Sequence, residues 1–289
     1  MNTALPSWFK QHLPEDIALS RMRLLSEFSI NTVCKQARCP NQGSCLKNSR
    51  LTFMILGNIC TRNCRFCGVE KSDGRPLGLD LEEPFRIAEV VKKLGLRYVV
   101  ITSVTRDDLQ DRGAEVFAKT VNLIHALNKD IKIEVLIPDF SGNTASLKAV
   151  IDSQPTVLGH NIETVKRLHS QLKSLQASFQ VSLDLLRKIK ELNPGLTTKS
   201  SLILGMGETE AEVIGTMQDL KYVHCDILTF GQYLAPSIDH YPVQEFVSIE
   251  QFRKYREIGM DLGFKAVLSA PLVRSSYQAE EVYNEVALS

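Results

Sequence analysis

From residue 51 onward, short apolar runs rich in β-branched residues alternate with longer stretches in which apolar positions recur every three or four residues. Apolar runs of this length predict buried strands, because both faces of a parallel sheet are covered. Six of them are LTFMILG (51–57), RYVVITS (97–103), IKIEVLI (131–137), PTVLGH (155–160), TKSSLILG (198–205) and DILTFG (226–231). In the longer stretches between these runs, the three- or four-residue spacing of apolar positions is typical of amphipathic helices.

The predicted helices have ordinary stop signals, since Gly95 ends one of them and Pro194 follows another. The helical stretches are EPFRIAEVVKKLG, AEVFAKTVNLIHALN, TASLKAVID, SLDLLRKIKELN and ETEAEVIGTMQDLKYV. A further helix, SIEQFRKYREIGMDLG, leads to the short run FKAVLS. Repeated strand–helix units of this kind predict a parallel sheet with right-handed crossovers.

The predicted fold class is therefore α/β, with an open, partial (β/α)6 barrel of the TIM type. About six units are too few to complete an eight-stranded barrel. A doubly wound sheet is the alternative, although no dinucleotide-binding glycine pattern follows the first strand. We expect residues 51–265 to form the barrel core, residues 1–50 an N-terminal extension and residues 266–289 a C-terminal extension.

Polar, residue-specific loops follow each predicted strand. After a cysteine loop come SVTRDDLQDRG, PDFSGN, HNIETV, GMGETE and QYLAPS. Any one of them is explained by turn or helix-cap chemistry. In βα barrels these loops share the face at the carboxyl ends of the strands, where active sites are built. Six such loops at one rim therefore predict an active site there.

Composition narrows the setting in which this site works. Of the 289 residues, 44% are apolar and 23% are charged, and the net charge of +1 predicts neither nucleic acid nor an acidic membrane as a partner. No apolar run approaches the length of a membrane span, and the first residues lack the apolar region of a secretory signal. We therefore expect a cytoplasmic protein, in which clustered cysteines indicate metal or redox chemistry rather than disulfides.

Six of the seven cysteines form two triplets. Cys34, Cys39 and Cys45 have Cx4Cx5C spacing, and Cys60, Cys64 and Cys67 have Cx3Cx2C spacing. Zinc sites are disfavoured, because neither triplet has a fourth cysteine or a histidine at finger spacing. Each triplet therefore either takes a fourth ligand from elsewhere or leaves one coordination position to something that is not protein. Cys225, the seventh, is most simply a small buried hydrophobic residue.

These motifs resemble a known family. The Cx3Cx2C loop after the first strand of a partial barrel resembles the radical SAM superfamily. The rest of the chain, from about residue 20, resembles lipoyl synthases in Cx4Cx5C, TFMILG, CTRNCRFC, VVITSVTRDDL, IEVLIPDF, HNIETV, TKSSLILGMGET, LTFGQYL and PLVRSSY. The departures from the family pattern are Asn58 in place of Asp, and Arg112 and Ser201 in place of Gly. Arg112 lies near the predicted rim, where it bears on substrate or cofactor contacts.

The resemblance implies two [4Fe–4S] clusters and S-adenosylmethionine as cofactors. Cys60, Cys64 and Cys67 hold the first cluster and leave one iron open for S-adenosylmethionine, with Phe66 beside it. Cys34, Cys39 and Cys45 hold an auxiliary cluster. A histidine, Cys225, water or a hydroxyl are candidates for its fourth ligand on chemistry alone; the family pattern places Ser276 of RSSY there. Arg274 is expected to orient the tail or to compensate cluster charge.

Contacts to the cofactor are expected from the loops that follow the strands. Thr102 and Ser103, and Asn161 with Glu163, have donors and acceptors for the methionine and ribose groups; helix capping is the alternative interpretation. Lys199 and Arg106 are candidates for steering carboxylates or an incoming protein.

The activity implied is sulfur insertion at C6 and C8 of an octanoyl chain on a lysine of a lipoyl-carrier protein, with the auxiliary cluster as sulfur donor. Expected partners are E2 subunits of 2-oxoacid dehydrogenases, the glycine cleavage H protein, flavodoxin or ferredoxin as electron donor, and a cluster-repair protein. The alternatives are another two-cluster radical SAM enzyme, biotin synthase-like or a methylthiotransferase, and a non-catalytic metal-binding module.

Overall fold

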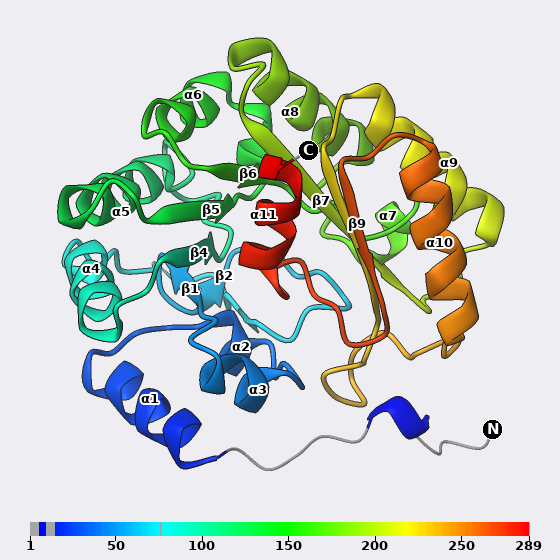
Figure 1. The fold of residues 1–289 in the computed structure, drawn as a ribbon. Coiled ribbons are helices and arrows are strands. Elements are labelled where there is room, and N and C mark those ends of the chain that lie inside the picture. Colours follow the sequence, from blue (N-terminus) through cyan, green and yellow to red (C-terminus); the bar gives the residue numbers. More distant parts are fainter. Residues whose placement is uncertain (1–5, 10–14, 76, 289) are drawn as a thin grey trace.

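A computed structural model describes residues 6–9, 15–75 and 77–288 of the chain. Its main sheet has seven parallel strands in the order β1-β4-β5-β6-β7-β8-β9 (Figure 1). The strands are β1 (Thr52–Ile55), β4 (Tyr98–Ser103), β5 (Lys132–Leu136), β6 (Val157–Gly159), β7 (Thr197–Leu204), β8 (Ile227–Gln232) and β9 (Ala266–Ser269). Each pairs with the next in the chain, so the order never reverses. This confirms a partial barrel and excludes a doubly wound sheet.

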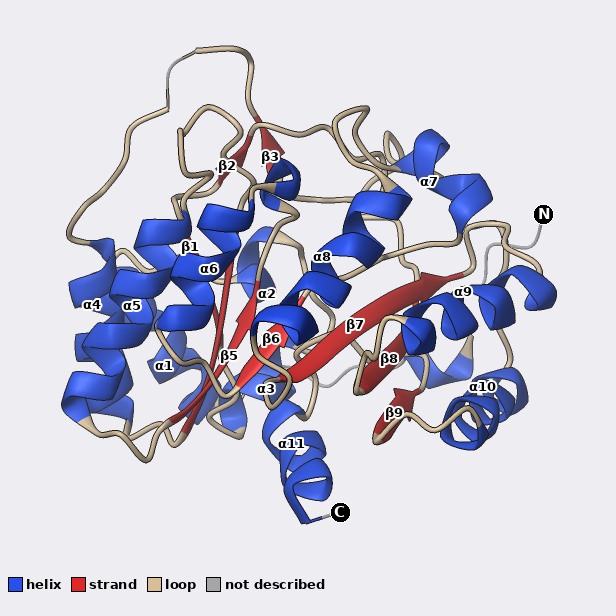
Figure 2. Ribbon diagram, turned by 90° about the horizontal axis from the view of Figure 1, so that it is seen from above, coloured by secondary structure: helices blue, strands red, loops and turns tan. Residues whose placement is uncertain are grey.

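Helices connect the strands on the outer side of the curved sheet (Figures 1 and 2). They are α4 (Glu83–Leu94), α5 (Ala114–Leu127), α6 (Thr144–Asp152), α7 (Lys166–Leu172), α8 (Phe179–Leu192), α9 (Glu210–Tyr222) and α10 (Ile249–Asp261). Their ends follow local chemistry: Gly95 ends α4 in the left-handed conformation, and Thr209 with Glu212 forms a capping box on α9. All but α7 were predicted from the apolar spacing.

The sheet has one strand more than the six expected from the sequence. In β9, Ala266 pairs with Ile227 of β8, so the FKAVLS run continues the sheet just past residue 265. The helix α11 (Ala279–Leu288) then turns back onto the inner side of the sheet (Figure 1). There Ala279 packs with Tyr98 and Val100 of β4.

The N-terminal part forms three helices beside β1 (Figure 1). They are α1 (Asp16–Glu27), α2 (Val33–Gln36) and α3 (Gln42–Lys47), and a 3-10 turn, η1, covers Ser7–Phe9. A small parallel pair, β2 (Ile59–Cys60) and β3 (Glu70–Lys71), encloses the second cysteine triplet, and a 3-10 turn, η2 (Phe140–Gly142), follows β5. Figure 2 shows the β2–β3 pair beyond one end of the main sheet, opposite the end at which α11 lies.

Candidate active site

The loop between β2 and β3 brings the thiols of Cys60, Cys64 and Cys67 together. All three are free and half-buried. Burial, with smaller contributions from charge repulsion by Cys64 and Cys60, raises the pKa of Cys67 to about 12. Two backbone N–H groups already donate to these sulfurs, from Arg62 to Cys60 Sγ (3.4 Å) and from Ser174 to Cys64 Sγ (3.4 Å). The bond from Ser174 favours the Cys64 thiolate but does not outweigh burial, so the pKa of Cys64 stays raised.

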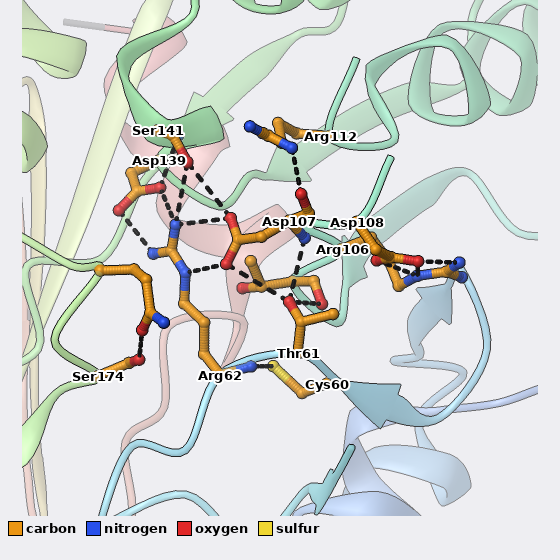
Figure 3. A network of polar contacts seen from close by, with 12 residues as sticks. Cys60, Thr61, Arg62, Arg106, Asp107, Asp108, Arg112, Asp139, Ser141 and Ser174 are labelled. Atoms are coloured by element: carbon orange, nitrogen blue, oxygen red, sulfur yellow. Dashed lines mark hydrogen bonds and ion pairs between the residues drawn. The ribbon is translucent and has the colours of Figure 1, made fainter. Parts of the chain in front are cut away.

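The side chain of Arg62, inside the cysteine motif, ties this loop to the two neighbouring strand ends (Figure 3). Its guanidinium donates to Asp139 after β5 at 2.7 Å and to Asp107 after β4 at 2.8 Å. Burial raises the pKa of Asp139, but the hydrogen bonds and charge of Arg62 outweigh it and bring the pKa to about 2. Sequence reasoning missed this triad, because nothing local marks the two aspartates as partners of Arg62.

Arg62→Met is expected to lower the free energy of unfolding by about 3–5 kcal/mol, because it leaves the buried Asp139 and the half-buried Asp107 carboxylates without their cation. The side chain of Asp139 is only 1% exposed, so water cannot replace the lost partner. Denaturant titration measures the change. Arg75→Met, which breaks the exposed pair with Asp73, is the matched control and should leave stability nearly unchanged. Equal effects of the two substitutions would contradict a structural role for the triad.

The upstream triplet lies on α2 and α3 and in the turn between them. Burial raises the pKa of the Cys34 thiol to about 12, with smaller contributions from Cys39 and Cys45. The three sulfurs therefore interact electrostatically, as those of the other triplet do. Among the described residues, no three His, Cys, Asp or Glu side chains are gathered closely enough for a single metal ion. A cubane spaces its thiolates more widely than one zinc ion, which holds sulfur at about 2.3 Å.

The C-terminal segment brings Ser276 to this upstream triplet. Thr52, the first residue of β1, donates from its hydroxyl to Ser276 Oγ at 2.8 Å. The backbone N–H of the same Thr52 hydrogen-bonds to Cys34 and lowers its pKa against the larger effect of burial. Asn41, between Cys39 and Cys45, donates to the Leu272 carbonyl at 2.6 Å. A ligand set of three cysteines and Ser276 is therefore compatible with the fold.

The strand-end residues expected to contact the cofactor differ in how fully they are bonded. Ser103 Oγ and Asn161 Oδ1 are buried without a hydrogen-bond partner, as expected of atoms that a ligand completes. Asn161 Nδ2 donates to Glu163 Oε1 at 3.0 Å, and Glu163 has a left-handed backbone (φ 71°). By contrast, the Thr102 hydroxyl is already bonded to the Leu136 carbonyl at 2.9 Å, and Phe66 packs against the main core.

Glu163 lies between two cations that come from different parts of the chain. Burial raises its pKa, while the charges of Lys173 and Arg274 and the amide of Asn161 oppose the increase. Burial lowers the pKa of Arg274, and the negative charges of Cys39 and Glu163 oppose that decrease. Arg274 therefore lies between the upstream triplet and the strand-end site, where the sequence analysis expected it to compensate charge. Lys173 was not predicted, because the loop after α7 has no motif.

Three basic residues bond to other groups of the protein. Lys199 forms a buried ion pair with Glu134 at 2.9 Å, and Arg106 pairs with Asp108 at 2.8 Å and donates to two backbone carbonyls. The prediction that Lys199 and Arg106 steer ligands is therefore wrong. Arg112 has a left-handed backbone (φ 59°), and its guanidinium donates to the Asp107 and Leu109 carbonyls of its own loop.

Comparison with known proteins identifies the family to which the chain belongs. Residues 54–220 match the radical SAM superfamily. The lipoyl synthase of Caldanaerobacter subterraneus subsp. tengcongensis is 52% identical over 97% of both chains. The lipoyl synthase of Aquifex aeolicus is 52% identical over 90% of this chain and 93% of its own. The chain belongs to the lipoyl synthase family. As a member of this family it is a radical SAM enzyme that uses S-adenosylmethionine and [4Fe–4S] clusters.

Solved structures support the fold of this lipoyl synthase family member. The FeFe-hydrogenase maturase of Carboxydothermus hydrogenoformans aligns with a TM-score of 0.61 at 14% identity, over 81% of this chain and 56% of the maturase. Methylornithine synthase aligns with a TM-score of 0.52 at 14% identity, over 89% of this chain and 84% of its own. Membership of the family also shows that a non-catalytic metal-binding module is the wrong interpretation.

Proposed function

We propose that this enzyme inserts two sulfur atoms, at C6 and C8, into an octanoyl chain attached to a lysine of a lipoyl-carrier domain. The observation that supports this most strongly is the contact between Thr52 and Ser276, because Thr52 also bonds to Cys34 and so holds the Ser276 hydroxyl close to the upstream triplet. A radical SAM enzyme that only removes hydrogen needs one cluster. A second cluster with a weak oxygen ligand suits an enzyme that must deliver sulfur.

In this proposal Cys60, Cys64 and Cys67 hold the cluster that binds S-adenosylmethionine. When bound, the cluster and S-adenosylmethionine would together supply a 5′-deoxyadenosyl radical, once a reduced donor protein has delivered one electron. This radical would take a hydrogen atom from an unactivated carbon. Ser103 and Asn161 offer their unpaired buried atoms to the cofactor, with Glu163 beside them. Arg62 keeps the cysteine loop in register with the strand ends.

Cys34, Cys39, Cys45 and Ser276 hold the auxiliary cluster, which supplies the sulfur. A serine oxygen is a hard ligand among soft thiolates, so it releases its iron more readily than a fourth cysteine. Cys225 is no rival sulfur carrier, because it is fully buried two residues before β8. Each carbon–sulfur bond would replace one carbon–hydrogen bond at the cost of one S-adenosylmethionine, and a cluster held by Cys34, Cys39, Cys45 and Ser276 would supply both the sulfur and the electron acceptor.

The proposed setting follows the activity. The carriers are E2 subunits of 2-oxoacid dehydrogenases and the glycine cleavage H protein, the electron donor is flavodoxin or ferredoxin, and a repair protein rebuilds the auxiliary cluster. Residues 1–50 and the chain after β9 would act as the two extensions that build the auxiliary site, since β9 itself belongs to the sheet. No helix in the described part of the chain is long and apolar enough to cross a membrane, and we place the enzyme in the cytoplasm.

Anaerobic incubation with S-adenosylmethionine, dithionite and an octanoyl-lysine peptide tests this function by mass analysis of the peptide. We expect addition of two sulfur atoms, at most about one product per chain without repair, and about two molecules of S-adenosylmethionine consumed for each. Reconstitution with heavy sulfide should label both product sulfurs. Unlabelled sulfur in the product, or many turnovers without a repair system, would contradict the auxiliary cluster as donor.

A further inference from the structure

One loop segment, residues 235–241, contacts both cysteine-bearing regions. It follows β8 and precedes α10, and its sequence is APSIDHY. Neither the catalytic chemistry nor the cofactor contacts described above account for it. We call it the bridge, because its two ends bond to segments that lie almost two hundred residues earlier in the chain.

One end of the bridge holds the cysteine loop of the radical site. His240 Nε2 lies 3.1 Å from the carbonyl oxygen of Cys67, and the Tyr241 N–H donates to the Arg65 carbonyl at 3.0 Å. The guanidinium of Arg65 in turn lies over the Tyr241 ring, 5.3 Å from its centroid. Two backbone carbonyls of the Cx3Cx2C loop are therefore bonded to the bridge.

The other end holds the turn of the auxiliary site. Arg38, the residue before Cys39, donates to the Pro236 carbonyl at 3.1 Å. Pro236 also packs on Gly68, the residue after Cys67: a Cβ built on Gly68 falls 2.9 Å from Pro236 Cβ and 3.9 Å from Ala37 Cα. A side chain at position 68 would therefore collide with Pro236, so the bridge packs closely on the residue after Cys67 while it bonds to the residue before Cys39.

The hydrogen bonds of His240 define how its ring is held. A carbonyl oxygen only accepts, so Nε2 must carry the proton that it donates to Cys67. Nδ1 lies 2.8 Å from Ser237 Oγ and accepts from that hydroxyl when the ring is neutral. Because both ring nitrogens are engaged, His240 is not a free ligand for the auxiliary cluster. The ring instead links Cys67 to the bridge.

We propose that residues 235–241 set the separation and orientation of the two iron–sulfur sites, with His240 as the main positioning residue. This inference rests on the proposed function, in which a carbon radical made at the first site must meet sulfur of the second. A misplacement of about 1 Å can slow such a step by about a hundredfold. The bridge would therefore determine what fraction of the carbon radicals go on to form a carbon–sulfur bond.

The test is the number of sulfur atoms inserted per S-adenosylmethionine cleaved, measured on the reconstituted full-length protein with an octanoyl-lysine peptide. His240→Phe keeps a ring but removes the donor to Cys67, and we expect this ratio to fall about tenfold while cleavage changes less than about threefold. His240→Gln restores an amide donor and should recover most of the ratio. Ile238→Ala is the matched control, because its side chain lies on the same bridge and is 99% exposed.

A second readout reports geometry rather than activity. The magnetic interaction between the two reduced clusters, measured by pulsed electron paramagnetic resonance, should change in His240→Phe and stay as in wild type in His240→Gln. If His240→Phe takes up less iron, Arg38→Met becomes the test variant. It removes the hydrogen bond to the Pro236 carbonyl by changing an exposed side chain. An unchanged ratio and magnetic interaction in an iron-replete variant overturn the proposal. Failure of wild type to insert sulfur would instead overturn the proposed function.

Discussion

Replacing Cys60, Cys64 and Cys67 together by alanine is expected to halve the iron of the reconstituted protein and to abolish cleavage of S-adenosylmethionine. Two cubane clusters amount to about eight irons and eight sulfides per chain. The three thiols interact within one loop, so no other cysteine of the described chain replaces them there. Iron and sulfide analysis after anaerobic reconstitution, followed by quantification of 5′-deoxyadenosine, measures both effects.

The upstream triplet provides the matched variant. Replacing Cys34, Cys39 and Cys45 by alanine should also halve the iron but leave cleavage measurable, because this site lies on α2 and α3, outside the β2–β3 loop. Cys225→Ala should retain the full iron content, since that thiol is fully buried elsewhere. Stoichiometric zinc without iron uptake, or loss of cleavage with either triplet alike, would refute the division of labour between the two sites.

Ser276→Ala is expected to retain cleavage of S-adenosylmethionine and to lose sulfur insertion. The hydroxyl of Ser276 is held by Thr52 at 2.8 Å, next to Cys34, so its removal would deprive the auxiliary site of its proposed fourth ligand and leave the radical site whole. Mass analysis of an octanoyl-lysine peptide measures insertion, and 5′-deoxyadenosine measures cleavage. Ser276→Cys should bind the cluster more firmly and slow the release of iron to a chelator.

Ser275→Ala is the natural control, because it removes a neighbouring hydroxyl from the same RSSY motif. We expect it to insert sulfur as the wild type does. Wild-type product yield from Ser276→Ala would show that this serine is dispensable. His240 would not take over as the ligand, because both of its ring nitrogens are already bonded.

Local patterns in the sequence were enough to predict most of the barrel. Apolar periodicity placed α6 at the same bounds as the structure, Thr144–Asp152, and ended α4 at Gly95. It also predicted the six strands from β1 to β8 that belong to the main sheet, because strand burial and helix amphipathicity are properties of neighbouring residues. The cysteine spacing likewise predicted two cluster sites, since the expected ligands of each triplet are close in sequence.

Other features depended on contacts between distant residues, which no local pattern specifies. β9 joins the sheet by pairing with β8, and the bridge joins two cysteine regions that are far from it in sequence. Ion pairs between distant residues are equally hidden from local patterns. Lys199 was predicted to steer ligands, but its charge is neutralised by Glu134, 65 residues away.

The site combines both kinds of information. The sequence by itself determined that three cysteines at Cx3Cx2C spacing lie at the rim of a βα barrel. Both the spacing and the position of the preceding strand depend only on residues that are close in sequence. Only the tertiary structure brought Ser276 to Thr52 across 224 residues and Arg62 to Asp139 across 77. The curvature of the sheet and the packing of the C-terminal segment bring these partners together. Their hydrogen bonds therefore form only once the whole chain has folded.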